Sequence, residues 1–254
     1  MVVMMPSVVM AQDISVYLKG ENMVDNQKGT PIIQEDRTFL PLRVIAEDLG
    51  FKVDWIQKTR EIYISNDKDK LLMKLDSKRY SLNKESKAMD VAPFIKEDRT
   101  YVPVRFVAEA LGSKAEWDGE NRLVLIGDYS SGQENVEGSR FELKGLGLTL
   151  FLPNGFKDKL VFVEDNTRGY SIYDKANYEA SNKEIGWIGS FKVEKNPGEN
   201  PVPHIILGKV DKNYLTFSFA SDLQSDNNKP NLTKSYEESK VGVRQVLKTL
   251  VFNK

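Results

Sequence analysis

The chain has 254 residues, of which 40% are hydrophobic and 29% charged, a composition typical of globular proteins that bury a substantial core. Its 36 Lys and Arg residues nearly balance 37 Asp and Glu residues, so we expect no basic field that would bind nucleic acid or an anionic membrane. Cysteine is absent and His204 is the single histidine, which excludes disulfides, thiol nucleophiles and multi-histidine metal sites. The composition therefore excludes most transition-metal sites, and we expect no metal and no cofactor.

The first residues, MVVMMPSVVMAQ, are typical of the end of a secretory signal peptide, because small residues follow an apolar stretch at Val9-Met10-Ala11. The positive segment that usually precedes the apolar stretch is missing, so the alternative is an apolar N-terminus of a cytosolic protein. We expect residues 1–11 to be a signal-peptide remnant and the protein to be extracellular or cell-wall associated, in a Gram-positive bacterium. No later stretch approaches the roughly 20 apolar residues of a transmembrane helix.

One structural unit is encoded twice in the N-terminal half. The run PIIQEDRTFLPLRVIAEDLGFKVDW from Pro31 returns as PFIKEDRTYVPVRFVAEALGSKAEW from Pro93, an offset of 62 residues (31 to 93). Self-similarity at a fixed offset predicts supersecondary units that stack and share a core. A catalytic constellation is normally assembled once, so residues matched in both copies are expected to maintain the unit.

Each copy reads as strand, strand, turn, strand and helix, followed by two more strands. The helices are expected where apolar residues recur at i, i+3, i+4 and i+7: Leu42, Ile45, Ala46 and Leu49, then Val104, Val107, Ala108 and Leu111. Pro41 and Pro103 suit the first helical turn, and Gly50 and Gly112 suit a left-handed C-cap. We therefore expect each unit to be a small antiparallel sheet wrapped on one helix.

These motifs resemble the N-terminal "stalk" domain of copper amine oxidases, in the apolar strand, the DRT turn, the LPLR or VPVR run, and AEDLG or AEALG. The resemblance covers about residues 12–127, as copies at about 12–66 and 71–127. It implies non-catalytic extracellular modules with a structural or binding role and no copper. Where that family usually has Asn-Gly-Arg-Thr this chain has Glu-Asp-Arg-Thr, which predicts a different turn type at Glu35-Asp36 and Glu97-Asp98.

Residues 128–139 (DYSSGQENVEGS) are predicted to be a flexible linker, because Ser, Gly and polar residues replace apolar ones. A second domain is expected over residues 140–254, with strands at Phe141–Leu152, Leu160–Glu164, Gly169–Tyr173, Gly186–Glu194, Ile205–Val210 and Tyr214–Ala220. Ser235 and Glu238 have capping-box spacing and predict the start of a C-terminal helix. The apolar stripe of this helix is Tyr236, Val243, Val246, Leu247 and Leu250. An α+β fold is expected, an antiparallel sheet covered by the helix, and this layout resembles the PsbP/Mog1-like sandwich.

Two motifs invite a catalytic interpretation. Asn177-Tyr178-Glu179 reproduces the tripeptide around the topaquinone tyrosine of amine oxidases, but that cofactor needs copper held by three histidines, so none is expected here. His204 leads out of a Pro-rich loop without a recognisable nucleophile, which favours a surface or strand-edge histidine over a catalytic triad. We expect no catalytic residue.

Other candidates are binding residues. Arg43 with Glu47, and Arg105 with Glu109, are spaced i, i+4, and their duplication favours a scaffold role over ligand-binding arginines. Asp36 and its copy Asp98 are better explained by turn chemistry than by a glycosidase pair. Aromatic residues in the alternating strands of the second domain fill its core or form a sugar-binding platform, and both readings stay open: Trp187, Tyr170, Tyr173, Phe217 and Phe219.

The sequence thus predicts an exported, non-enzymatic cell-surface or wall-associated protein. In this prediction the repeats are a spacer or wall module and the second domain binds a cell-wall polymer or a secreted or surface protein. The binding candidates are Trp187, Tyr170, Tyr173, His204, Arg43 and Arg105. The alternatives are a small secreted hydrolase using Glu164, Asp165 and Asp174, or a regulator of a secreted enzyme. The oligomeric state is not predicted.

Overall fold

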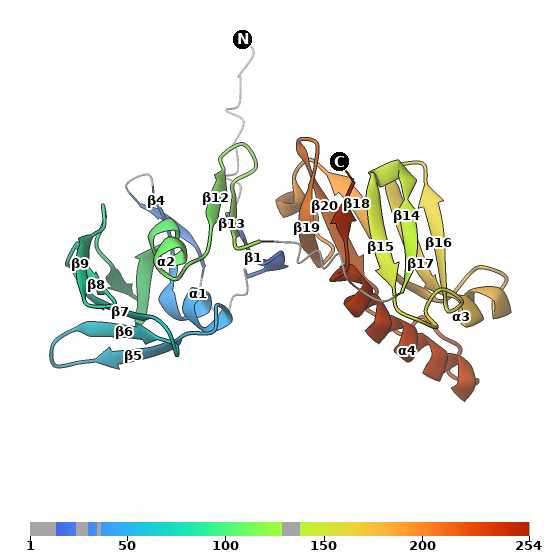
Figure 1. The fold of residues 1–254 in the computed structure, drawn as a ribbon, viewed down its shortest axis with the longest axis horizontal. Coiled ribbons are helices and arrows are strands. Elements are labelled where there is room, and N and C mark those ends of the chain that lie inside the picture. The colour runs from blue at the N-terminus through green and yellow to red at the C-terminus, as the bar shows by residue number, and fades with distance from the viewer. Residues whose placement is uncertain (1–13, 24–29, 35–36, 129–137, 254) are drawn as a thin grey trace, which may run out of the picture. The chain divides into compact units, whose positions relative to one another are not determined.

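A computed structural model describes residues 14–23, 30–34, 37–128 and 138–253 (Figure 1). The chain divides into two compact units, one of residues 1–18 and 23–126, the other of residues 19–22 and 127–254. Both combine antiparallel sheets with a few helices, so the predicted α+β class is confirmed. The predicted signal-peptide remnant and most of the predicted linker lie outside the described residues.

The N-terminal unit contains a central antiparallel sheet in the order β10 (Phe94–Lys96), β11 (Arg99–Pro103), β4 (Arg37–Pro41), β3 (Ile32–Gln34). A second sheet is a meander of β5 (Lys52–Ile56), β6 (Glu61–Ser65), β7 (Lys70–Lys74), β8 (Arg79–Leu82) and β9 (Glu85–Ala88). A third set pairs β12 (Ala115–Asp118), β13 (Leu123–Ile126) and β1 (Ser15–Leu18). Two short helices complete the unit, α1 (Leu42–Asp48) and α2 (Val104–Ala110).

The two sequence copies share their sheets. Leu40 of β4 lies opposite Val102 of β11, its own counterpart 62 residues later, so the paired strands have a local two-fold relationship. The first strand, β1, pairs in parallel with β13, which belongs to the second copy. The expectation of a separate sheet for each copy is wrong, because a lone two-stranded hairpin is only marginally stable and pairing β4 with β11 covers one edge of each hairpin. One hydrophobic core contains residues of both copies.

Both helices follow the predicted apolar stripe. Leu42, Ile45 and Ala46 of α1 are buried, and Val104, Val107 and Ala108 of α2 repeat this burial. Pro41 and Pro103 end the preceding strands and stand at the N-caps, one position before the first helical residue. Gly50 and Gly112 have φ values of 87° and 77°, the left-handed conformation in which a glycine carries little steric cost. The predicted helix termini are confirmed at these glycines.

The turn between β10 and β11 corrects one prediction. Glu97 (φ 50°) and Asp98 (φ 56°) are both left-handed, and Lys96 pairs with Arg99 across this two-residue loop. Two positive φ values define the type I′ turn, which is the turn that Asn-Gly also favours. The prediction of a different turn type is therefore wrong for Glu97-Asp98, because the twist of the hairpin dictates the turn. Glu35-Asp36 lie outside the described residues.

Replacing Glu97-Asp98 by Asn-Gly (Glu97→Asn, Asp98→Gly) is expected to stabilise the protein by about 1 kcal/mol, because the left-handed conformation strains other side chains by roughly this amount. Urea denaturation of the full chain measures the change. The matched control is Lys68→Gly in the loop between β6 and β7, where φ is negative and no gain is expected. A lower midpoint for the Asn-Gly variant would contradict the turn assignment.

The C-terminal unit contains two sheets. One is formed by β14 (Ser139–Leu143), β15 (Leu148–Leu152) and β21 (Val251–Phe252). The other runs β16 (Leu160–Asp165), β17 (Gly169–Asp174), β18 (Trp187–Glu194), β20 (Asn213–Phe219), β19 (His204–Val210), with β2 (Glu21–Asn22) beside β19. The helices are α3 (Lys175–Ala180), α4 (Pro230–Leu247) and the 3₁₀ turns η1 (Lys144–Leu146) and η2 (Pro197–Glu199). Helix α4 packs across β15, β17 and β18 (Figure 1).

Several local predictions for this unit are wrong. Helix α4 begins at Pro230, five residues before Ser235, because a proline without an N–H group suits the first helical position. The predicted single strand Phe141–Leu152 is two strands divided by η1, and neither α3 nor β21 was predicted. The apolar stripe of α4 is confirmed in the core, while Leu250 is buried just beyond the end of the helix.

Candidate functional site

Of the predicted aromatic candidates of the C-terminal unit, Tyr173 and Trp187 lie side by side and are half-buried, whereas Tyr170 is buried. Tyr170 is 7% exposed in the core, where the Gly145 N–H donates to its hydroxyl at 3.3 Å, and burial raises its pKa. Tyr173 lies opposite Trp187 across β17 and β18, and its ring packs on Tyr178 at 4.7 Å. The Trp187 indole N–H donates to Ser190 Oγ at 2.8 Å. These contacts use the rings within the fold.

His204 begins β19 and is 7% exposed. Its Nδ1 lies 2.7 Å from the carbonyl oxygen of Val202, so the ring is fixed by the main chain two residues earlier. Within the described part of the chain, no three His, Asp or Glu residues are grouped as metal ligands would be. Nor does any helix of this part have the length and apolar character to cross a membrane.

The Asn177-Tyr178-Glu179 tripeptide forms part of α3, and its asparagine has a structural position. Asn177 is fully buried, with its main-chain N–H and its side-chain amide donating to Asp174 Oδ1 at 3.0 and 2.6 Å. The amide also donates to the Leu232 carbonyl of α4 at 2.8 Å. The tripeptide thus holds α3 against α4.

The carboxylates of the hydrolase alternative are not brought together. Leu160 pairs with Asp174 at one end of the β16–β17 hairpin, whereas Glu164 pairs with Tyr170 toward the other end. Four residues along a strand separate the two ends by about 13 Å, beyond the roughly 5 to 10 Å of a glycosidase pair. Burial acts to raise the pKa of Asp165, but hydrogen bonds from Thr167 and Gly169 outweigh it and lower the pKa.

Two grooves in the N-terminal unit do bring candidate residues together. Groove A has a volume of about 700 Å³, and its lining includes Ile33, Arg37, Thr38, Arg105, Phe106, Glu109 and Trp117. Groove B has a volume of about 760 Å³, and the counterparts 62 residues away line it: Ile95, Arg99, Thr100, Arg43, Val44, Glu47 and Trp55. Each groove combines the hairpin of one copy with the helix and tryptophan of the other copy, so the local two-fold relationship of β4 and β11 generates both.

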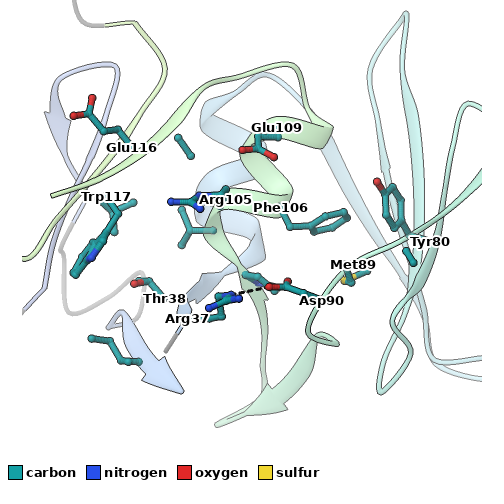
Figure 2. A pocket seen from close by; sticks show the side chains of 16 residues that line it. Arg37, Thr38, Tyr80, Met89, Asp90, Arg105, Phe106, Glu109, Glu116 and Trp117 are labelled. Carbon is teal, nitrogen blue, oxygen red and sulfur yellow. Dashed lines mark hydrogen bonds and ion pairs between the residues drawn. The ribbon is translucent and has the colours of Figure 1, made fainter. Parts of the chain in front are cut away.

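Groove A is seen from close by in Figure 2, with Trp117 at one end and Tyr80 at the other. Arg105 and Phe106 of α2 lie between them, and the Phe106 ring meets Tyr80 edge to face at 4.6 Å. Arg37 Nε donates to Asp90 Oδ2 at 2.7 Å within the groove. Arg105 and Glu109 of α2 line groove A. Their counterparts in groove B, Arg43 and Glu47 of α1, form an exposed ion pair at 3.3 Å. The structure thus places the predicted Arg43 and Arg105 at equivalent positions.

Apolar side chains stand exposed at matching positions of the two grooves. Trp55 is 37% and Trp117 39% exposed, while Ile33 and Ile95 are 46% and 49% exposed. These side chains were overlooked in the sequence, where the tryptophans were read only as strand ends. Their recurrence at the same offset as the repeat is the signal that could have identified them.

The ion pair in groove A gives a pH-dependent prediction. The hydrogen bond from Arg37 lowers the pKa of Asp90 below its ordinary value of 3.8. A lowered pKa in the folded state means that the stabilisation is complete above the unfolded value and is lost as the pH falls through the folded value. Both side chains are about half exposed, so solvent screening limits the contribution to about 1 kcal/mol or less.

We expect Arg37→Gln to raise the Asp90 pKa toward 3.8, and to lower stability at pH 6 with no effect at a pH below the Asp90 titration. Carbon-13 NMR of the Asp90 carboxyl group and urea unfolding at both pH values measure these changes. Arg43→Gln is the control, because its partner Glu47 is remote from Asp90 in sequence and lies in groove B. An Asp90 titration that does not move would contradict the assignment.

Two comparisons with known proteins match part of this chain. A "Protease inhibitor" of Brevibacillus choshinensis is 34% identical over 120 residues, which are 47% of this chain and 36% of that protein. The chain thus spans about a third of the length of this relative. The PsbP/Mog1-like resemblance of the C-terminal unit stays a prediction. Residues 17–126 match the family described as "Copper amine oxidase N-terminal domain", and the resemblance predicted from the repeated motifs is confirmed for this part of the chain.

Proposed function

We propose that this chain is an exported, non-enzymatic binding protein, held at the cell surface or the cell wall, whose N-terminal unit engages a partner through grooves A and B. The observation that carries the proposal is the pair of exposed Trp and Ile side chains that recurs at equivalent positions. The Val9-Met10-Ala11 motif supports export. The C-terminal unit, as a PsbP/Mog1-like sandwich, supplies a second interaction domain in this proposal.

Trp55, Trp117, Ile33 and Ile95 are between 37% and 49% exposed. Complete burial of an aromatic or large aliphatic side chain is worth about 1.5–3 kcal/mol relative to full exposure, so a ligand that covers the remaining surface of these four recovers part of that stabilisation. Two arginines line groove A and three line groove B, and these supply orienting hydrogen bonds. A concave surface with apolar side chains and a few polar groups is the usual form of a binding site.

The test compares the full chain with a Trp55→Ala, Trp117→Ala double variant. Retention of the protein on purified cell-wall sacculi, and on immobilised secreted and surface proteins, is expected to fall about tenfold in the double variant. The control is Tyr63→Ala, which removes an aromatic ring of similar exposure, 39%, from outside both grooves. Equal retention of the double variant and the wild type would refute the grooves as binding sites.

A second candidate is a regulator of a secreted protease, which the name of the Brevibacillus choshinensis relative favours. In this version the partner of the N-terminal unit is a protease. Titration of purified bacterial extracellular proteases with the full chain, followed by cleavage of a peptide substrate, tests it. Inhibition at a stoichiometric ratio, weakened in the double tryptophan variant, is the expected result. Unchanged cleavage by every protease would exclude protease regulation, and the partner of the N-terminal unit would then be of another kind.

A further inference from the structure

We propose that grooves A and B are peptide sites, in which an extended acidic segment of a partner protein adds as a strand to each edge of the central sheet. The proposal rests on the proposed function and names the class of partner. Among the described residues, the sheet order β10-β11-β4-β3 places β3 and β10 at its two edges. Ile33 lies at the centre of β3 and Ile95 at the centre of β10, and each lines the groove beside its edge.

Hairpin geometry shows which main-chain groups the edges offer. In β10–β11 the pair that closes the two-residue turn is Lys96 with Arg99, so these residues exchange both hydrogen bonds. The next pair, Ile95 with Thr100, is then not hydrogen-bonded, and the N–H and C=O groups of Ile95 point away from β11. Ile33 has the same position in β3–β4, opposite Thr38. Each edge therefore presents one donor and one acceptor to an added strand.

The grooves supply the side-chain recognition that such an added strand needs. In strand addition the main-chain bonds give affinity, and pockets for alternate side chains give specificity. The exposed ring of Trp55 or Trp117 suits an apolar side chain, whereas the guanidinium of Arg105, or that of Arg43 in exchange for Glu47, suits a carboxylate. The fitting ligand is thus an extended peptide in which carboxylate and apolar side chains alternate. An oligosaccharide could stack on the tryptophan but would not use the outward main-chain groups.

The two grooves differ in net charge, and this difference ranks their affinities for an acidic peptide. Groove B is lined by four basic residues (Arg43, Lys58, Arg60, Arg99) and three acidic ones (Glu47, Asp48, Asp98), a net charge of +1. Groove A is lined by two basic residues (Arg37, Arg105) and three acidic ones (Asp90, Glu109, Glu116), a net charge of −1. An acidic peptide therefore binds groove B more tightly, by about tenfold for two charges at a solvent-exposed surface.

Fluorescence anisotropy with the full chain tests the inference. The probe is an octapeptide of alternating Glu and Val, with fluorescein on its N-terminal amine and an amidated C-terminus. Two binding steps are expected, the first about tenfold tighter, with both weakened by salt. A peptide of alternating Lys and Val, and the Glu-Val peptide methylated on alternate main-chain nitrogens, are each expected to bind at least tenfold more weakly.

Two protein variants locate the tight step. Ile95→Pro removes the outward N–H of β10 and is expected to abolish the tight step, since proline is tolerated where an edge N–H faces solvent. The matched control, Ile95→Thr, keeps the N–H and the tight step. Arg43→Gln is expected to weaken the tight step about tenfold, and Arg105→Gln the weaker step.

The outcomes separate this inference from the proposed function. Absence of peptide binding, or binding that main-chain methylation and Ile95→Pro leave unchanged, would overturn strand addition. If chitohexaose binds instead and Trp55→Ala removes that binding, the grooves remain binding sites but their ligand is a glycan, and the peptide inference fails. If the Trp55→Ala, Trp117→Ala variant is retained on sacculi and on surface proteins as well as the wild type is, the proposed function itself fails.

Discussion

Asp174→Ala is expected to destabilise the protein by about 3–5 kcal/mol, because it removes the shared acceptor of a buried polar network. Asp174 is fully buried at the N-cap of α3. Its Oδ1 accepts from the main chain and side chain of Asn177, and its Oδ2 accepts from the hydroxyls of Ser235 and Ser239 at 2.8 Å each. The substitution would remove the acceptor of the Asn177 main-chain N–H and of the Ser235 and Ser239 hydroxyls, and would leave the bond from the Asn177 amide to the Leu232 carbonyl as the hydrogen bond of this network between α3 and α4.

Urea unfolding of the full chain, followed by tryptophan fluorescence, measures the loss. Glu179→Ala is the matched control, since its side chain lies on the same helix, is 65% exposed, and makes only a 4.0 Å contact with Lys175. It is expected to change stability by less than about 0.5 kcal/mol. Asp174→Asn should fall between the two, because it keeps one acceptor oxygen but turns an amide group toward the donors. A loss below about 1 kcal/mol for Asp174→Ala would show that water replaces the carboxyl group.

The same network explains why the C-terminal helix was misread. Ser235 and Glu238 satisfy the local capping-box spacing, yet Ser235 lies in the interior of α4. Its hydroxyl donates to Asp174, 61 residues earlier in the chain. A capping pattern describes a bond within one turn, and nothing in it reveals a distant acceptor. The proline that does begin the helix, Pro230, follows a polar loop and has few apolar neighbours, so the apolar period gave no reason to extend the helix that far.

The predictions that rested on the apolar period and the glycine caps of α1 and α2 succeeded, whereas those that depended on strand pairing did not. The stripes of α1 and α2 and their glycine C-caps follow from a period of 3.6 residues and from left-handed geometry. Which hairpin edge pairs with which is decided by long-range contacts, so the sharing of β4 with β11 was not visible in the sequence. Grooves A and B arise from that sharing, which is why Arg43 and Arg105 could be proposed only singly and Trp55 and Trp117 were missed.

Gly242→Ala in the middle of α4 is expected to destabilise the protein by about 1–3 kcal/mol, although alanine is the better helix former by about 1 kcal/mol. A Cβ atom at this position would overlap the ring of Phe156, which packs partly buried against the core of the C-terminal unit. Gly242 is itself buried on the same side of the helix as Val243 and Val246. The glycine therefore permits the close approach of the ring to the helix backbone.

A double-mutant cycle with Phe156→Ala separates the steric effect from the helix propensity. Phe156→Ala alone is expected to cost about 2–3 kcal/mol, but in that background Gly242→Ala has no ring to meet and should stabilise the protein by about 1 kcal/mol. The control is Val241→Ala, 59% exposed on the same helix, where a small gain is expected in either background. A Gly242→Ala effect of the same sign and size with and without Phe156 would place its cause elsewhere in α4. Reversal of the sign would show that one glycine sets how closely the helix packs on the loop that carries Phe156, between β15 and β16.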